Sequence, residues 1–390
     1  MRNFLSDRCV SLKPSGIRKF FDIVSEMPDA ISLGVGEPDF DTPWHIREEG
    51  IYSLERGKTF YTSNSGLMEL RQEICNYLKR RIGVEYQPAG EVIITVGGSE
   101  AIDIAMRAML NPGDEVLIPL PSYVSYEPCC ILAGGVPVTI ELQEKDEFRL
   151  KPEQLRAAIT DRTKILVLPF PNNPTGGIME KADLEAIADI IMENDLFVLS
   201  DEIYAELTYG DDHVSIASLP GMKERTIVIN GFSKAYAMTG WRLGYAAGPK
   251  EIITQMTKIH QYCIMCAPTT SQYAAVEALK NGDEDVARMR ESYDGRRRYL
   301  LHAMAEMNLK CFEPKGAFYI FPNISRFGLT SEEFATQLLM EEKLAVVPGT
   351  AFGDCGEGFI RISYAYSLEN LKEAMSRIQR FVKKLEAKEC

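Results

Sequence analysis

Short apolar runs alternate with longer amphipathic stretches through the middle of the chain, and this alternation restricts the fold more than any other feature. The predicted strands are Glu91–Val96, Glu115–Ile118, Val136–Ile140, Lys164–Leu168, Leu196–Leu199 and Thr226–Ile229. The predicted helices are Ser99–Leu110, Tyr123–Leu132, Lys181–Glu193 and Glu251–Leu279. Buried strands that alternate with helices indicate an α/β fold, in which a mainly parallel central sheet is covered by helices on both faces.

The pattern changes from about Glu291 onward. A long helix is followed by shorter elements, which are predicted at Gly316–Phe321, Ser331–Glu341, Leu344–Val347, Gly358–Tyr364 and from Leu368. This order indicates a smaller α+β unit. The N-terminal region is irregular and contains four prolines, so we expect it to join the smaller unit or to reach a partner chain. The predicted organisation is an arm with part of the small domain (1–45), a large domain (46–290) and a small C-terminal domain (291–390).

Length and composition are those of an ordinary globular protein. A chain of 390 residues suggests about two or three domains. Apolar residues make up 45% and charged residues 25%, which excludes disordered and fibrous classes. No apolar run approaches the ~20 residues of a membrane span, so we expect no membrane partner. The N-terminus mixes charges and lacks an apolar signal core, which predicts that the protein is not exported.

Charge and cysteine content favour a cytoplasmic protein that does not bind nucleic acid. The net charge is −13, and an acidic surface repels phosphate backbones. The nine cysteines are odd in number and scattered, which is typical of free thiols in a reducing compartment. Cys263 and Cys266 form a single CxxC without a second pair, so we expect buried thiols there. The four histidines lie far apart and show no metal-ligand spacing.

Small and polar residues follow four of the predicted strands. In an open parallel sheet, ligands bind beyond the carboxyl ends of the strands. The segments at these ends are Gly97–Glu100, Pro169–Gly176, Ser200–Tyr204 and Asn230–Lys234. Each alone has an ordinary structural explanation, such as a tight turn, a helix cap or a solvated side chain. Their equivalent places in the sheet predict one site that combines an amide, a carboxylate, a phenol and an amine.

The segment from Gly231 to Gly244, GFSKAYAMTGWRLG, resembles the lysine signature of class I/II pyridoxal-phosphate aminotransferases of fold type I. Further motifs match this family in the family's order, namely LGVGEPD at 33–39, Tyr61, NPTG at 173–176, DEIY at 201–204 and FIRIS at 359–363. The resemblance covers nearly the whole chain and is closest to the bacterial aspartate, aromatic and N-acetyl-diaminopimelate branch. It implies pyridoxal 5′-phosphate as the cofactor, which composition and periodicity do not show.

The resemblance implies roles for the residues of the catalytic centre. Lys234 would hold the cofactor aldehyde as a Schiff base and, once freed, would move a proton at the substrate α-carbon. Asp201 would pair with the pyridine nitrogen and keep it protonated. Asn173 and Tyr204 would donate hydrogen bonds to the phenolic oxygen of the ring. Tyr123 would stack on the ring face.

The same resemblance places the cofactor phosphate at the start of the first predicted helix. Gly98, Ser99 and Glu100 would offer free backbone N–H groups, and the helix dipole favours an anion there. The positively charged guanidinium of Arg242 would bind the phosphate in a bidentate manner.

Two features of the phosphate site depend on residues elsewhere in the chain. Many relatives carry a serine where this chain has Gly231, and Ser233 is the nearest hydroxyl that could compensate. Tyr61 matches a tyrosine that family members contribute to the phosphate site of the neighbouring subunit, which implies an active homodimer.

The substrate side of the site is implied by residues near the two chain ends. Arg361 would clamp the α-carboxylate, for which the guanidinium fork is suited. Gly36 would let its backbone approach the substrate, and Ile17 would form an apolar lid over it.

The leading hypothesis is therefore an aminotransferase that moves an amino group from an amino acid to a 2-oxo acid by a ping-pong mechanism. An alternative that keeps the cofactor is a carbon–sulfur β-lyase of the same fold. A non-catalytic regulatory module and a nicotinamide dehydrogenase rank lower, the latter because the glycine fingerprint is incomplete. The motifs leave the amino donor open among aspartate, aromatic amino acids, alanine and N-acetyl-diaminopimelate.

Overall fold

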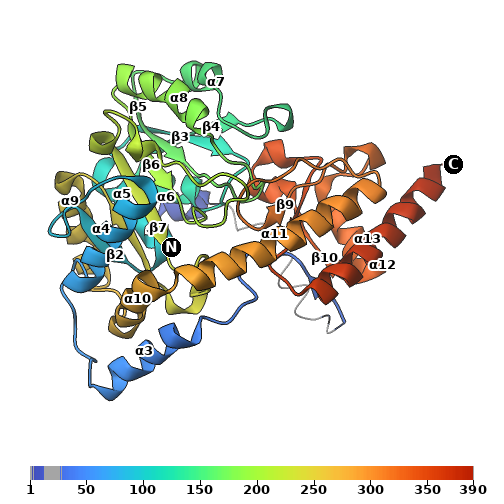
Figure 1. The fold of residues 1–390 in the computed structure, drawn as a ribbon. Coiled ribbons are helices and arrows are strands. Elements are labelled where there is room, and N and C mark those ends of the chain that lie inside the picture. Colours follow the sequence, from blue (N-terminus) through green and yellow to red (C-terminus); the bar gives the residue numbers. More distant parts are fainter. Residues whose placement is uncertain (1, 3, 13–26, 28, 390) are drawn as a thin grey trace.

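The computed structural model describes residues 2, 4–12, 27 and 29–389 (Figure 1). Its largest sheet contains, in spatial order, β2 (Val92–Thr95), β8 (Gly244–Ala247), β7 (Thr226–Gly231), β6 (Phe197–Asp201), β5 (Thr163–Leu168), β3 (Glu115–Leu120) and β4 (Val136–Glu141). Neighbouring strands from β7 to β4 run parallel, whereas β8 is antiparallel to both β2 and β7. The predicted, mainly parallel sheet is confirmed, and each of the six predicted strands is present.

Strand β8 is the part of this sheet that the pattern did not predict. Its four residues, GYAA, are buried on both faces and show no alternation. Gly244 also packs closely against Gly97, where α5 begins, since a Cβ on Gly244 would lie 2.6 Å from the carbonyl carbon of Gly97. A short strand of small residues is explained by this close approach of two backbones.

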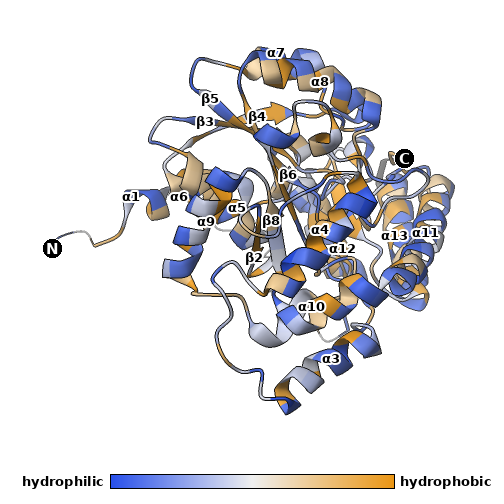
Figure 2. Cartoon of the chain, turned by 60° about the vertical axis from the view of Figure 1, so that its left-hand side comes forward, coloured by the Kyte–Doolittle hydropathy of each residue, from blue (hydrophilic) through white to orange (hydrophobic). Residues whose placement is uncertain are grey.

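Helices cover both faces of the large sheet because successive strand residues point to opposite sides. In β2, Ile93 packs with α5 (Gly97–Met109), α6 (Tyr126–Ala133) and α9 (Lys250–Cys263). Val92 and Ile94 face the other side, which is covered by α4 (Met68–Ile82), α10 (Thr269–Asn281), α7 (Pro152–Ala158) and α8 (Lys181–Glu193). Figure 2 shows the apolar strands inside and the hydrophilic outer sides of the helices.

One predicted helix proved to be two. The prediction of a single helix over Glu251–Leu279 was wrong, because α9 ends at Cys263 and α10 begins only at Thr269. Pro268 precedes α10 and lacks the N–H that a continuous helix would need.

A smaller unit is built mainly from the C-terminal third of the chain. Strands β11 (Val347–Pro348), β12 (Ile360–Ser363) and β9 (Tyr319–Ile320) form an antiparallel sheet. Strand β1 (Ile31–Ser32) pairs in parallel with β10 (Leu344–Ala345). The helices are α11 (Asp283–Glu306), α12 (Ser331–Glu342) and α13 (Leu368–Glu389). The predicted strand Leu344–Val347 is thus divided between two sheets.

The N-terminal region and α11 connect the two units. Helix α1 (Asp7–Ser11) reaches α6 through a hydrogen bond from Arg8 to the Leu132 carbonyl (3.3 Å), and α3 (Trp44–Glu55) packs against α10. Through the pairing of β1 with β10, part of this region lies beside the smaller unit. Helix α11 continues across residues 290 and 291 (Figure 1), so the proposed domain boundaries stay a prediction.

Within the residues that the structure describes, no helix combines the length and the apolar character that crossing a membrane would require.

Candidate active site

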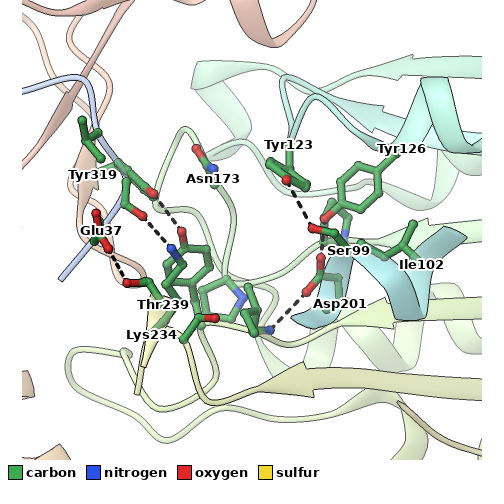
Figure 3. Close-up of a pocket in the computed structure, with 18 of the residues that line it drawn as sticks. Glu37, Ser99, Ile102, Tyr123, Tyr126, Asn173, Asp201, Lys234, Thr239 and Tyr319 are labelled. Atoms are coloured by element: carbon green, nitrogen blue, oxygen red, sulfur yellow. Dashed lines mark hydrogen bonds between the residues drawn. The ribbon is translucent and has the colours of Figure 1, made fainter. Parts of the chain in front are cut away.

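A cavity of ≈ 420 Å³ opens at the carboxyl edge of the large sheet, beyond β5, β6 and β7 (Figure 3). Its lining brings together segments that are far apart in the sequence. The predicted site residues found in this lining are Gly36, Gly98, Ser99, Tyr123, Asn173, Asp201, Tyr204, Ser233, Lys234, Arg242 and Arg361.

Lys234 enters the cavity from the loop after β7. Its Nζ donates a hydrogen bond to the backbone carbonyl of Gly36 at 2.5 Å. Burial lowers the pKa of this amine to about 8; Glu37 opposes the shift, while Arg361 and Arg242 add to it. A lysine with this pKa is partly neutral near physiological pH, which a nucleophile or proton acceptor requires.

Asp201 ends β6 and lies buried at the opposite side of the cavity. Its Oδ2 accepts a hydrogen bond from the Tyr126 hydroxyl at 2.7 Å, and its Oδ1 accepts one from the backbone N–H of Ile203 at 3.2 Å (Figure 3). Burial raises the pKa of this carboxyl, and the two hydrogen bonds oppose the shift. A buried carboxylate that accepts hydrogen bonds from two neutral donors is suited to pair with a cationic group of a ligand.

Arg361 lies in β12 and is buried between two aromatic rings. Its guanidinium carbon is 4.5 Å from the ring centre of Tyr319 and 4.7 Å from that of Phe352. Nη1 donates to Asn173 Oδ1 at 2.8 Å, and Nη2 donates to the carbonyl of Gly34. The buried Nε has no hydrogen-bond partner within the described part of the chain, so the guanidinium keeps a donor for a ligand.

Tyr204 and Tyr319 meet across the cavity wall. Their hydroxyl oxygens are 2.7 Å apart, and both side chains are buried. A Cβ added to Gly36 would overlap the hydroxyl oxygen of Tyr319, which explains why the smallest residue occupies position 36.

The first turn of α5 and Arg242 form one end of the cavity. Gly97 has φ +77°, which favours glycine, and a Cβ there would lie 2.7 Å from Arg242 Nη2. Ser99 Oγ lies 3.4 Å from the hydroxyl of Tyr123. The N-terminus of a helix together with an arginine is suited to an anion such as phosphate.

Three predicted site residues are not among the described lining residues. The side chain of Glu100 turns away, because its Oε2 accepts from the Val96 N–H at 2.5 Å and its Oε1 pairs with His260 Nδ1 at 2.6 Å. The expectation for Glu100 concerned its backbone N–H, which this geometry leaves untested. Tyr61 is 82% exposed and does not line the cavity of its own chain. Ile17 lies outside the described residues.

Several residues of the lining were not predicted, and four of them make side-chain contacts beside the cavity. Tyr126 and Tyr319 make the contacts given above, and Thr239 donates a hydrogen bond to the carboxylate of Glu37. Tyr126 lies three residues after Tyr123 at the start of α6, which is the signal that could have drawn attention to it. Tyr319 carries no comparable signal, because its importance depends on residues more than 100 positions away.

The CxxC prediction was partly wrong. Cys263 is exposed and Cys266 is only partly buried, because α9 ends at Cys263 and the following loop lies at the surface. The eight cysteines that the structure describes are free thiols, as expected.

The chemistry of the lining fits pyridoxal phosphate, the cofactor that the sequence resemblance implies. Asp201 offers a buried carboxylate that pairs with no cationic side chain among the described residues, Lys234 offers a partly neutral amine, and the α5 N-terminus with Arg242 offers an anion site. These three features match the pyridinium, the aldehyde and the phosphate of that group.

Comparisons with known proteins agree with this chemistry. A profile of the family described as "Aminotransferase class I and II" matches residues 28–378. The chain is 50% identical to an aspartate aminotransferase of Pyrococcus abyssi, over 97% of this chain and 98% of that protein. It is 46% identical to aromatic-amino-acid aminotransferase 2 of Thermococcus litoralis, again over 97% and 98%. The solved aspartate aminotransferase of Thermus thermophilus with maleate superposes with a TM-score of 0.93 at 40% identity, covering 97% of this chain and 100% of that one.

These matches extend over nearly the whole chain and carry the names of aminotransferases, so they do not favour the β-lyase alternative. The substrates are accordingly an amino acid and a 2-oxo acid. With its family profile, its fold and the donor set of its cavity in agreement, the chain belongs to the class I and II aminotransferases and is a pyridoxal-phosphate-dependent enzyme that transfers amino groups.

Proposed function

We propose that the cavity carries out transamination with Lys234 as both the covalent anchor of the cofactor and the proton carrier. The observation that supports this proposal is the convergence of a partly neutral lysine, a buried carboxylate and a buried arginine from three distant segments. Bound pyridoxal phosphate supplies a ring that withdraws electrons from the substrate α-carbon. The protein supplies binding, orientation and a base.

Lys234 Nζ is the group that removes the proton from the α-carbon of the amino donor. The pKa of about 8 leaves part of the amine neutral at physiological pH, and the nearby Arg361 and Arg242 favour this form. The Gly36 carbonyl holds Nζ on the side of the cavity that faces the substrate clamp. A base with a pKa close to the operating pH is the most effective in general acid–base catalysis.

Asp201 keeps the pyridine nitrogen protonated, and Asn173 and Tyr204 bind the phenolic oxygen. Asn173 suits this role because its Oδ1 already accepts from Arg361, which leaves Nδ2 as a donor toward the cavity. Tyr123 lines the cavity beside Tyr126, with the two rings 5.8 Å apart, and stacks on the cofactor ring.

Gly98 and Ser99 at the first turn of α5 would hold the cofactor phosphate, with Arg242 as its charged partner. Ser233 also lines the cavity and supplies a hydroxyl near this end. The backbone N–H of Glu100 adds a donor, while the Glu100 side chain faces His260 and so keeps its charge away from the phosphate.

Arg361 binds the α-carboxylate of either substrate. Its Nε, unpaired in the part of the chain that the structure describes, lies in a buried site between two rings, where a charge-assisted hydrogen bond is strong. Gly36 lets its backbone approach the substrate beside the clamp. Ile17 is retained in the proposal as an apolar lid.

The proposed active form is a homodimer in which Tyr61 completes the site of the neighbouring subunit. Tyr61 and Phe60 are 82% and 80% exposed, and α3 adds further exposed apolar side chains at Trp44, Ile51 and Leu54. An apolar surface of this kind is suited to a second copy of the chain. We also propose a cytoplasmic location, which the free thiols support.

Replacing Lys234 with alanine tests the anchor. We expect transamination to fall to about 10⁻⁴ of the parent activity or less, and borohydride reduction to attach no cofactor to the protein. Lys280→Ala is the matched control, because Lys280 pairs with Glu69 at the surface. Retained transamination in K234A, or a borohydride label on another lysine, would contradict the proposal.

Mixing two defective variants tests the dimer. Tyr61→Ala and Lys234→Ala subunits, after exchange, should form hybrids with one intact site, so that activity rises to about a quarter of the parent value. No recovery in a mixture shown to contain hybrid dimers would contradict a contribution from the neighbouring subunit.

A panel of donors determines the amino substrate. Aspartate, phenylalanine, alanine and N-acetyl-diaminopimelate, each with 2-oxoglutarate, should differ in kcat/KM, while R361A lowers kcat/KM for all of them. The panel separates the substrate side chain from the α-carboxylate that all donors share.

A further inference from the structure

We infer that Tyr319 is a positioning residue that directs the hydroxyl of Tyr204 toward the phenolic oxygen of the cofactor. This inference rests on the role proposed above for Tyr204. Tyr319 lies in β9 of the smaller unit, whereas Tyr204 follows β6 of the large sheet. The contact between them therefore joins the two units at the cavity.

The argument starts from the number of hydrogens that two phenols can share. The two hydroxyl oxygens are 2.7 Å apart, and either could be the donor. Each phenol has a single hydrogen to donate. If Tyr204 donates to the cofactor oxygen, the hydrogen between the two phenols must come from Tyr319. Binding of the cofactor thus selects one of two arrangements.

The surroundings hold Tyr319 in place for this role. Its ring packs edge-on against Tyr204, with centroids 5.9 Å apart and planes at 78°, and its other neighbours include Phe318 at 4.9 Å. Only 1% of the residue is exposed. Gly36 leaves space for its hydroxyl, since any larger residue would overlap that oxygen. Figure 3 shows Tyr319 near Glu37, on the side of the pocket opposite Tyr126 and Asp201.

Arg361 plays the corresponding role for the second donor. Its Nη1 binds Asn173 Oδ1 at 2.8 Å, which leaves the amide N–H groups of Asn173 free to point elsewhere. The Arg361 guanidinium also stacks on the Tyr319 ring. Both groups that bind the cofactor oxygen are therefore oriented from the substrate side of the cavity, one by Arg361 and one by Tyr319.

Deleting single hydroxyls tests the inference. Tyr319→Phe keeps the ring and its stacking on Arg361 but removes the hydrogen bond. The dissociation constant of pyridoxal phosphate, measured on the holoenzyme by equilibrium dialysis, should rise about threefold to tenfold. Tyr204→Phe should raise it by at least as much. The double variant should match Y204F alone, because Tyr319 acts through the Tyr204 hydroxyl.

A matched control separates this role from simple stability. Tyr209 is a buried tyrosine in the same apolar cluster, and its hydroxyl donates to the Ala317 carbonyl at 2.6 Å without lining the cavity. Y209F should lower the melting temperature as much as Y319F does and leave cofactor affinity unchanged. Because Y319F keeps the ring on Arg361, the KM of the amino donor should change less than twofold.

Each outcome decides the question. An unchanged affinity in Y319F, or single effects that multiply in the double variant, overturns the inference while the role of Tyr204 stands. If Y204F itself binds the cofactor as tightly as the parent, the proposed role of Tyr204 and this inference fail together.

Discussion

One wall of the cavity is built from consecutive strand ends of a single sheet, and the opposite wall from segments near the two ends of the chain. Asn173, Asp201 and Lys234 belong to the first wall, at or just beyond the carboxyl ends of β5, β6 and β7. Gly36 and Arg361 belong to the second wall. Backbone hydrogen bonds between parallel strands fix the spacing of the first wall, whereas the second depends on side-chain contacts between separate elements.

The comparison indicates that the two walls have different functions. The first wall holds the groups that would act on the cofactor, and the second holds the groups that would recognise the substrate carboxylate. The walls are joined by two contacts, Arg361 to Asn173 at 2.8 Å and Tyr319 to Tyr204 at 2.7 Å. A change in the second wall should therefore alter substrate binding first and reach the cofactor only through these contacts.

The largest effect is expected from Asp201→Asn in the first wall. The amide keeps the shape but cannot hold the proton of a pyridinium as a carboxylate does. We expect kcat to fall about 10²- to 10³-fold, as when one partner of a buried charged pair is lost. Steady-state kinetics and cofactor affinity measure this effect. A variant that retains more than about a tenth of kcat would count against the role of Asp201.

Arg361→Lys should produce a different pattern from the second wall. The lysine keeps the charge but loses the planar fork and the stacking on Tyr319. We expect kcat/KM to fall about 10²-fold for every donor, mainly through KM, with a smaller loss of cofactor affinity, about threefold to tenfold, through the weakened contact to Asn173. If R361K and D201N changed the same kinetic constants, the division between the walls would be wrong.

Gly36→Ala tests the fit between the chain ends. The added methyl group would displace either the Tyr319 hydroxyl or the segment around Gly36. We expect KM for the amino donor to rise about tenfold and the free energy of unfolding to fall by about 1–3 kcal/mol. Gly295→Ala is the control, because a Cβ at that position in α11 meets nothing within 4 Å. Unchanged kinetics in G36A would show that this wall tolerates displacement.

Tyr126→Phe should have the smallest effect, and it should depend on pH. The Tyr126 hydrogen bond opposes the burial that raises the pKa of Asp201, so its loss raises that pKa further. The titratable groups around Asp201 are Tyr126 from α6 and Glu202 and Tyr204 at the end of β6. A smaller fraction of the Asp201 carboxyl group is then ionised at acid pH.

The dissociation constant of pyridoxal phosphate should accordingly rise in Y126F by a factor that grows as the pH falls from about 8 to about 6. Affinity measured across this range for the variant and the parent provides the test. A ratio that stays constant with pH would mean that Tyr126 contributes packing alone.

Much of the first wall could be predicted because its determinants are local. Helix α8 begins and ends at the predicted residues, Lys181 and Glu193. The strands β5, β6 and β7 were each found from their apolar runs, and parallel pairing then places their carboxyl ends at one edge. Apolar periodicity over a few residues carries this information, so no distant contact is needed to read it.

The second wall and the irregular elements were harder to predict. The predicted strand Leu344–Val347 contributes β10 to a pair with β1 and β11 to a different sheet. Strand β8 has too few apolar residues for a pattern. Tyr319 and Tyr126 were missed because a tyrosine in an apolar segment is, by itself, no different from other core tyrosines.

The sequence by itself determined most of the strands and helices of the large sheet, the segments at the strand ends, and the family motifs that imply a lysine-bound cofactor. Only the tertiary structure decided which of these residues face one cavity, that the Glu100 side chain turns away from it, and that Tyr319 meets Tyr204. The physical reason is the difference in sequence separation over which these interactions act. Periodicity and turn chemistry act between near neighbours, whereas the burial that lowers the pKa of Lys234 and the hydrogen bonds that hold Arg361 arise between residues brought together only when both chain ends pack against the sheet.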